Sequence, residues 1–268
     1  MGNITPHLTV IVRASGEATT PYLMKQLNKQ VTSDDNLSVI DNQESFEMKL
    51  KQGFEKAFKI NNPFSVFIDA DILVRSNVIT KIRSLCFKLN DNDLGFGLRL
   101  WDRFYDQPKF RGLHIYQTKF LKLAIKHIPD VGDTIRPESF TKNSLSENNV
   151  RWNNNLTRYV AGIHDYGQYS ADIFYKFLIR KERSDEKEIF KLKKTINQRV
   201  YSKDFEVAMK ALNYTTDKKI TNQKSKYHDV LKIFDKNSQL DMPNNIDMYL
   251  LKKLFFRYKF SHLFFKSF

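Results

Sequence analysis

Short apolar runs alternate with longer segments of helical spacing over the first 130 residues, and this alternation constrains the fold more than any other feature. Apolar runs of strand length occupy residues 8–12, 37–40, 64–68 and 94–100. Apolar residues recur at helical spacing at about 20–30, 45–59 and 77–89. Strands that alternate with helices form βαβ units. The sequence therefore predicts an α/β fold with a mainly parallel sheet flanked by helices.

The rest of the chain is less regular. Residues 113–116 predict a short strand and residues 118–127 a helix, whereas the polar, Asn-rich stretch 130–160 predicts a loop. From about residue 169 the pattern is helical and basic. We expect a catalytic domain over residues 1–180 and a helical, basic C-terminal region over residues 181–268.

Composition narrows the class of protein. The chain has 268 residues, of which 41% are hydrophobic and 28% charged, and this excludes a wholly disordered chain. The single cysteine, Cys86, excludes an intramolecular disulfide framework and a cysteine-based zinc ribbon. No run of 18 apolar residues is present and the N-terminus does not resemble a signal peptide. We therefore expect a cytoplasmic protein.

The charge is strongly basic and uneven. Lys and Arg number 44 against 30 Asp and Glu, a net charge of +14. Residues 181–268 hold 20 of the basic and 11 of the acidic residues, which is +9 of that total. Such a surface attracts nucleic acid, anionic lipid or phosphorylated ligands, and it is also typical of a solvated lysine-rich face.

Two carboxylates follow the most apolar strand directly. The segment FSVFIDADIL places Asp69 and Asp71 at the carboxyl end of the strand over residues 64–68. Ligands of open α/β sheets bind at that edge. Two acids one residue apart repel each other unless a cation lies between them, and carboxylate oxygens suit Mg²⁺ or Mn²⁺. The alternative is a strand-end turn capped by aspartates.

This layout resembles that of glycosyltransferases with the GT-A fold, in particular the family 2 nucleotide-sugar transferases. The resemblance covers roughly residues 8–175: a first strand in LTVIVRASGE, a second that ends at Asp41, a helix in FEMKLKQGFEKAF, and then the D-x-D motif. It implies a Rossmann-like sheet, a nucleotide-sugar donor and a divalent metal, Mn²⁺ or Mg²⁺. The loop after the first strand, RASGE, departs from the family's usual P-x-Y-N.

The resemblance assigns roles to particular positions. Asp41 would accept a hydrogen bond from the base, Asp69 would lie near the ribose and the metal, and Asp71 would ligate the metal. The nucleotide-sugar contacts that it implies are Arg13, Ser15, Glu17, Asp41, Asp69 and Asp71.

A second cluster, AGIHDYGQY, begins at residue 161. By the same resemblance His164 would complete a metal shell with Asp69 and Asp71, and Asp165 would be the base that deprotonates the acceptor hydroxyl. Glu138 is the rival base. Alternatively, His164 and Asp165 cap the helix that begins near residue 168.

The acceptor side of such a site would include Gly112 and His114, at the floor of the pocket, and Trp101. An aromatic ring beside charged residues suits sugar stacking, although Trp101 fits equally well in the core.

The C-terminal segment 250–268 combines five basic and seven aromatic residues with no acid. This composition is typical of a helix that lies on an anionic membrane surface, and it also fits a helix docked on the catalytic domain. We expect a peripheral association with the inner face of the membrane.

These observations predict a metal-dependent hexosyltransferase that moves a sugar from a nucleotide-sugar donor to a glycan or lipid-linked acceptor in surface polysaccharide or lipopolysaccharide biosynthesis. The alternatives are a nucleotidyltransferase of similar fold and a basic nucleic-acid-binding protein. The first lacks its Gly-rich, lysine-containing loop after the first strand, and the acid pair makes nucleic acid an unlikely partner.

Overall fold

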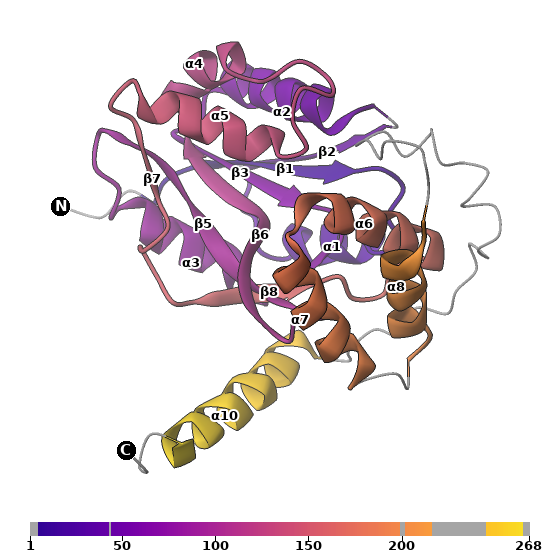
Figure 1. Cartoon of the computed structure of the whole chain (residues 1–268). Coiled ribbons are helices and arrows are strands. Elements are labelled where there is room, and N and C mark those ends of the chain that lie inside the picture. The colour runs from indigo at the N-terminus through magenta and orange to yellow at the C-terminus, as the bar shows by residue number, and fades with distance from the viewer. Residues whose placement is uncertain (1–4, 43, 199–201, 216–244, 265–268) are drawn as a thin grey trace.

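The chain forms one mixed sheet covered by helices on both faces, as seen in a computed structural model (Figure 1). The structure describes residues 5–42, 44–198, 202–215 and 245–264, with side chains placed as far as residue 255 in the last of these segments. The predicted α/β fold is confirmed.

Eight strands of the described chain build the sheet in the order β2-β1-β3-β6-β5-β8-β4, with β7 beside β5. All strands except β6 and β4 run in one direction, so the sheet is mainly parallel. The strands are β1 (Leu8–Ala14), β2 (Asn36–Asp41), β3 (Phe64–Asp69), β4 (Ile72–Val74), β5 (Asp93–Asp102), β6 (Gln107–Gln117), β7 (Arg151–Asn153) and β8 (Val160–His164).

Helices bury both faces of the central strands because successive strand residues point to opposite sides. On β1, Val10 and Val12 pack against α1 (Thr20–Asn28) and α3 (Val78–Cys86). The intervening Ile11 packs against α2 (Phe46–Ile60), α4 (Leu121–Lys126) and α5 (Pro137–Ser146). A short 3-10 turn, η1 (Thr118–Phe120), leads into α4. This two-sided burial explains why β1 is apolar at nearly every position.

A second core forms beyond the sheet. The helices α6 (Ser170–Arg183), α7 (Glu186–Asn197) and α8 (Lys203–Asn213) share a cluster of apolar side chains with Phe104, which follows β5. The rings of Phe104 and Phe177 lie 4.6 Å apart, edge to face. The predicted boundary at residue 180 falls within α6, whose buried apolar side chains belong to this helical cluster.

The last helix, α10 (Ile246–Phe264), extends away from the body of the molecule (Figure 1). Its first turns are docked, because Ile246 and Leu250 are buried beside Trp101 and Asp247 accepts a 2.7 Å hydrogen bond from Nε of Arg75. Leu251, by contrast, is 57% exposed. The apolar residues of α10 therefore occupy more than one side of the helix.

Two elements correct the prediction of a loop over residues 130–160. Helix α5 and strand β7 both lie in this stretch. The buried positions of α5 include Glu138, which accepts a hydrogen bond from Tyr116, and Thr141, whose hydroxyl donates to the backbone carbonyls of Pro137 and His127. Because polar residues occupy part of its buried face, the sequence of α5 lacks the helical spacing of apolar residues that would have predicted a helix.

Candidate functional site

A cavity of about 820 Å³ opens at the carboxyl ends of β1 and β3, between these strands and the helices α5 and α6. Its location is the one expected for ligands of an open α/β sheet. Asp69 and Asp71 both line it. The side chains around the cavity form two charge networks, which we call the Arg13 network and the Lys176 network.

The Arg13 network joins β1, β3 and α5. The Arg13 guanidinium donates a 2.8 Å hydrogen bond from Nε to Asp69, and its Nη2 lies 3.4 Å from Oε2 of Glu138. Burial would lower the pKa of Arg13, but Asp69 and Glu138 outweigh it and keep the guanidinium charged. Arg13 is thus the cation shared by the buried Glu138 carboxylate and the half-buried Asp69 carboxylate.

Glu138 has further partners in this network, so its carboxylate is strongly held. Tyr116 donates a 2.5 Å hydrogen bond to Glu138, and Nδ1 of His114 lies 2.7 Å and Nζ of Lys142 3.7 Å from the same oxygen, Oε1. Burial acts to raise the pKa of Glu138, but His114, Lys142 and Arg13 hold it well below its usual value. Burial lowers the pKa of His114 to about 4 against the opposing effect of Glu138.

Gly112 gives Asp69 the space that it occupies. A Cβ atom at position 112 would lie 2.4 Å from Oδ2 of Asp69, and the backbone there has φ +40°. Both facts favour glycine. Burial, with Asp71 and Glu138 nearby, raises the pKa of Asp69 to about 6 against the opposing effect of Arg13.

The Lys176 network lies on the other side of the motif. The Lys176 ammonium contacts both Asp71 and Asp165, and Nη2 of Arg180, one helical turn further along α6, donates a 2.5 Å hydrogen bond to Asp165. The backbone at Asp165 has φ +65°, and its N–H donates to the carbonyl oxygen of Asp71 at 3.1 Å. The loop after β8 is therefore tied to the D-x-D loop.

His164 connects this network to the end of β5. Its Nε2 lies 3.5 Å from Asp71, while its Nδ1 lies 3.0 Å from Asp165 and 3.5 Å from Asp102. Burial alone would lower the pKa of His164, but Asp165 and Asp71 raise it to about 9. Burial opposes ionisation of Asp102, yet Arg180 and His164 lower its pKa to about 2.

Three side chains of the Lys176 network could together hold a metal ion. One ligand atom each of Asp71, His164 and Asp165 lies within 4.8 Å of the others. Carboxylate and imidazole ligands suit Mn²⁺, and Oδ1 of Asp71 is buried without a hydrogen-bond partner. The predicted ligands Asp71 and His164 are thus brought together, but with Asp165; Asp69 is instead held by Arg13.

Lys176 stands where such an ion would sit, between two of the three ligands. About a quarter of its side chain is exposed, so it has room to withdraw into the cavity. Exchanging the Lys176 ammonium and the His164 proton for one divalent cation leaves the charge of the network unchanged, since metal ligands must be deprotonated. The residues present therefore fit a divalent metal once Lys176 moves.

The structure places some of the predicted nucleotide contacts in the cavity lining and one outside it. Ser15 and Glu17 line the cavity, where the Ser15 N–H donates to the Glu17 carboxylate at 2.5 Å. Lys49 of α2 joins them and contacts the Ser15 hydroxyl. Asp41 lies outside the lining and accepts a 3.1 Å hydrogen bond from the N–H of Gly16.

Two of the three predicted acceptor residues line the cavity and one does not. Gly112 and His114 line the cavity. Trp101 does not: it is 2% exposed, its Nε1 donates to Asp106 at 3.2 Å, and its ring belongs to the core cluster that receives α10. The structure thus supports the core alternative for Trp101, because the side chain points to the face of β5 that α10 covers.

The two candidate bases differ in access to the cavity. Glu138 lines it, whereas Asp165 is 1% exposed behind His164 and Lys176. Neither His164 nor Asp165 caps α6, whose N-cap residue is Tyr169. The capping alternative is therefore wrong.

Sequence reasoning missed the cations that complete both networks. Lys176 and Arg180 are spaced one turn apart on α6, and Lys142 faces Glu138 one turn along α5. A pair of basic residues at i and i+4 on a helix that follows a cluster of acids is a signal that could have found the first two. No comparable signal marks Lys49 in α2.

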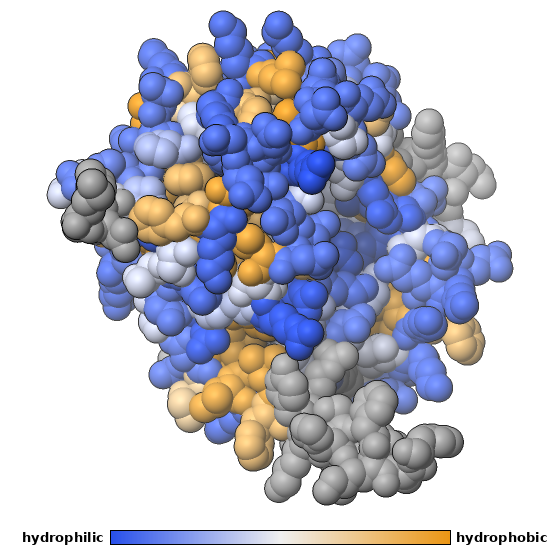
Figure 2. All heavy atoms as spheres, turned by 90° about the vertical axis from the view of Figure 1, so that its left-hand side faces the viewer, coloured by the Kyte–Doolittle hydropathy of each residue, from blue (hydrophilic) through white to orange (hydrophobic). Residues whose placement is uncertain are grey.

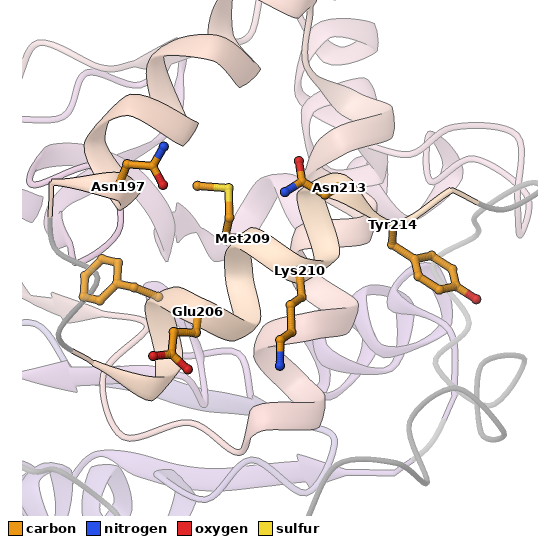
Figure 3. Close-up of a pocket in the computed structure, with 7 residues that line it drawn as sticks. Asn197, Glu206, Met209, Lys210, Asn213 and Tyr214 are labelled. Carbon is orange, nitrogen blue, oxygen red and sulfur yellow. The ribbon is translucent and has the colours of Figure 1, made fainter.

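A smaller hollow of about 440 Å³ lies between the end of α7 and α8, as Figure 3 shows. Asn197, Met209 and Asn213 line it, with Glu206 and Lys210 one turn apart on α8. Its lining includes one acidic and one basic residue, which is far fewer charged groups than the large cavity has. We do not assign it to the chemistry.

Comparison with known proteins gives structural likeness only. No family model and no curated protein matches the sequence. The mannosyltransferase PcManGT from Pyrobaculum calidifontis, in complex with GDP-Man and Mn²⁺, matches 78% of this chain and 70% of its own at 13% identity and TM-score 0.47. TarS 1-349 from S. aureus, in complex with UDP-GlcNAc, matches 77% and 70% at 12% identity and TM-score 0.40.

A third similar structure is a glycosyltransferase involved in the glycosylation of the major capsid of PBCV-1. It matches 62% of this chain and 96% of its own, at 13% identity and TM-score 0.39.

Proposed function

We propose that this protein is a metal-dependent glycosyltransferase that moves a sugar from a nucleotide-sugar donor to a glycan or lipid-linked acceptor. One observation carries the proposal: the carboxylates after β3 and the His164 imidazole after β8 meet at one cavity large enough for a nucleotide sugar. We further propose the family 2 type of transferase, a hexose as the transferred group, and a role in surface polysaccharide or lipopolysaccharide biosynthesis.

The chain's own residues would divide the work along the cavity. Ser15, Glu17 and Lys49 would contact the nucleotide, because they line the cavity at the carboxyl end of β1. Asp71 and His164, with Asp165, would hold Mn²⁺ or Mg²⁺, which when bound supplies positive charge to the donor diphosphate. Lys176 would leave its position between the aspartates as the ion enters.

Glu138 is the better of the two proposed bases because it lines the cavity and Asp165 does not, while the pKa of both carboxyls is held well below its usual value. Its low pKa makes it a weak base. We therefore propose Asp165 as a positioning residue that orients His164 and Lys176, and Glu138 as the carboxylate that receives the acceptor proton.

The proposal is tested by thermal shift of the full chain with a panel of nucleoside diphosphates, with and without Mn²⁺. A nucleotide that binds only with Mn²⁺ should raise the melting temperature of the wild type and leave that of Asp71→Asn unchanged. The matched control Asp91→Asn changes an exposed aspartate away from the cavity and should respond like the wild type. An equal shift in Asp71→Asn would overturn the motif assignment.

We also propose that the chain is cytoplasmic and binds the inner face of the membrane through α10. The described chain contains no helix long and apolar enough to cross a membrane. The surface shown in Figure 2 is mostly hydrophilic, with hydrophobic side chains gathered at its lower left. Leu251 and Phe255 of α10 are 57% and 65% exposed, and the basic residues of the tail suit anionic lipid.

Vesicle binding tests this part of the proposal without removing the docked turns of α10. The double variant Leu251→Glu, Phe255→Glu should lose binding to vesicles that contain phosphatidylserine. Phe190→Glu on α7, where the ring is 70% exposed, is the matched control and should bind like the wild type. Equal binding by all three proteins would refute the membrane role of α10.

A further inference from the structure

Four arginines from three elements gather at one end of the large cavity. Arg111 comes from β6, Arg136 is the N-cap residue of α5, and Arg180 and Arg183 lie on the last turns of α6. All four line the cavity. Nη2 of Arg136 donates a 3.2 Å hydrogen bond to the backbone carbonyl of Arg183, which brings α5 and α6 together at this point.

Within the described chain, the acids that contact Arg111 and Arg180 are shared with other cations. Nε of Arg111 lies 3.5 Å from Asp102, and Arg180 lies 3.6 Å from the same oxygen as well as 2.5 Å from Asp165. Both acids also neutralise His164. Glu188, at the rim of the cavity, lies 3.8 Å from Lys109 and accepts a hydrogen bond from Tyr105.

The close packing of these cations affects the pKa of Arg183. Burial first, and then the neighbouring cations Arg136, Arg180 and Arg111, lower the pKa of its guanidinium to about 10. Arg180 is buried, at 7% exposed. Its Nη1 has no hydrogen-bond partner. A buried guanidinium N–H without an acceptor is costly unless a ligand supplies one.

The position of the cluster in the sheet separates it from the proposed nucleotide contacts. Those contacts follow β1, whereas Arg111 lies on β6, which is separated from β1 by β3. Along α6, Arg183 lies seven residues beyond Lys176, which is about 10 Å of helix. The cluster is therefore on the far side of the D-x-D motif from the nucleotide half of the cavity.

We propose that the acceptor carries a phosphate group and that Arg111, Arg136, Arg180 and Arg183 bind it. Guanidinium groups bind phosphate through paired hydrogen bonds, and several of them match its multiple charge and oxygen atoms better than they match a single carboxylate. This inference rests on the proposed function and adds a substrate class to it: a phosphorylated glycan or a lipid-linked phosphate as acceptor.

The donor's own diphosphate is the other source of phosphate in this site, and competition separates the two. Calorimetry of the full chain with inorganic phosphate, alone and then with saturating UDP or GDP and Mn²⁺, measures both. We expect phosphate to bind equally well in the presence of the nucleotide. Displacement of phosphate by the nucleoside diphosphate would overturn the assignment to the acceptor.

Arginine variants test whether the cluster is the site. The double variant Arg136→Gln, Arg183→Gln should weaken phosphate binding about tenfold or more and leave nucleotide binding unchanged. The matched control Arg151→Gln, Arg158→Gln removes the same two charges from exposed arginines outside the cavity and should bind phosphate like the wild type. Equal weakening in the control and the double variant, or no phosphate binding by the wild type, would overturn the proposal.

Two further readouts keep the test decisive. The single variant Arg136→Gln changes an exposed side chain and replaces the double variant if that protein does not fold. If the protein binds phosphate through these arginines but binds no nucleoside diphosphate, the phosphate site stands and the proposed transferase function is refuted. If it binds the nucleotide with Mn²⁺ but shows no arginine-dependent phosphate binding, the transferase proposal stands and the phosphate site is refuted.

Discussion

The Arg13 network and the Lys176 network face the same cavity with similar charged groups, yet they differ in whether their cation can leave. Arg13 is 4% exposed and holds two carboxylates from β3 and α5. Lys176 bridges Asp71 and Asp165 with a side chain that is 27% exposed, and Oδ1 of Asp71 next to it has no partner. The first network is closed, and the second can exchange its cation.

The difference shows that buried charge alone does not identify a metal site. A guanidinium with two buried partners is fixed by the cost of leaving them unpaired. An ammonium on a flexible stem at a cavity wall can be replaced by another cation at little cost. We therefore expect the Arg13 network to contribute stability and the Lys176 network to contribute metal affinity.

The largest effect should follow from removing the fixed cation. Arg13→Met leaves the buried Glu138 and the half-buried Asp69 without their shared cation and should lower the free energy of unfolding by about 3–5 kcal/mol, as measured by urea denaturation. Arg99→Met, at a half-buried arginine that packs on Phe110, is the control and should cost far less. A loss of less than about 1 kcal/mol for Arg13→Met would mean that the network is not closed.

Crowding the fixed network should have the next largest effect. Gly112→Ala places a Cβ atom 2.4 Å from the Asp69 carboxylate, which must move away from Arg13. Gly132→Ala is the matched control, since its φ is also positive but nothing lies within 4 Å of the added atom. We expect Gly112→Ala to lower the free energy of unfolding by about 1–3 kcal/mol more than the control. Equal losses would show that Asp69 moves freely.

Removing the exchangeable cation should have a smaller effect that Mn²⁺ reverses. Lys176→Met should lose about 1–2 kcal/mol of stability in metal-free buffer, because Asp71 and Asp165 lose their bridging ammonium. It should also bind Mn²⁺ more tightly than the wild type, because the ion no longer competes with the lysine. Calorimetric titration with Mn²⁺ measures the affinity, and weaker binding by the variant would contradict the exchange.

The same comparison predicts that Mn²⁺ does not rescue Arg13→Met. A thermal melt of both variants with and without Mn²⁺ checks this. Rescue of both to the same extent would mean that the ion acts elsewhere on the chain.

The smallest expected effect is a dependence of stability on pH. The His164 pKa is raised to about 9, above its ordinary 6.5, so its stabilising contribution is complete below pH 6.5 and is lost as the pH rises to 9. Asp69, with a pKa of about 6, titrates below this window and Lys142, at about 8, at its upper end. Between pH 6.5 and 8 the metal-free chain should lose on the order of 1 kcal/mol.

His164→Gln should remove that dependence. Melting temperatures of both proteins across this window, in chelated buffer, provide the measurement. A wild type whose melting temperature rises over the same window would show that His164 is not held as the imidazolium.

Much of the fold and half of the site were predictable from local patterns. The apolar runs at residues 8–12 and 64–68 became central strands because helices cover both their faces, and Asp69 and Asp71 follow from their position after β3. Helix α5 was not predictable, because its buried face includes Glu138, whose charge is satisfied by residues of β1 and β6 as well as by Lys142 of the same helix. Trp101 was ambiguous, since only the docking of α10 assigns it to the core.

The sequence by itself determined the alternation of strands and helices over the first 130 residues and the edge at which the carboxylates emerge, because both depend on neighbours within a few residues. Only the tertiary structure decided which cation each carboxylate receives. Asp71 pairs with Lys176, 105 residues further along the chain, and Arg13 with Glu138, 125 residues away. Such pairs leave no periodic trace in the sequence, because the free energy of a buried charge depends on what surrounds it in space and not on its neighbours in the chain.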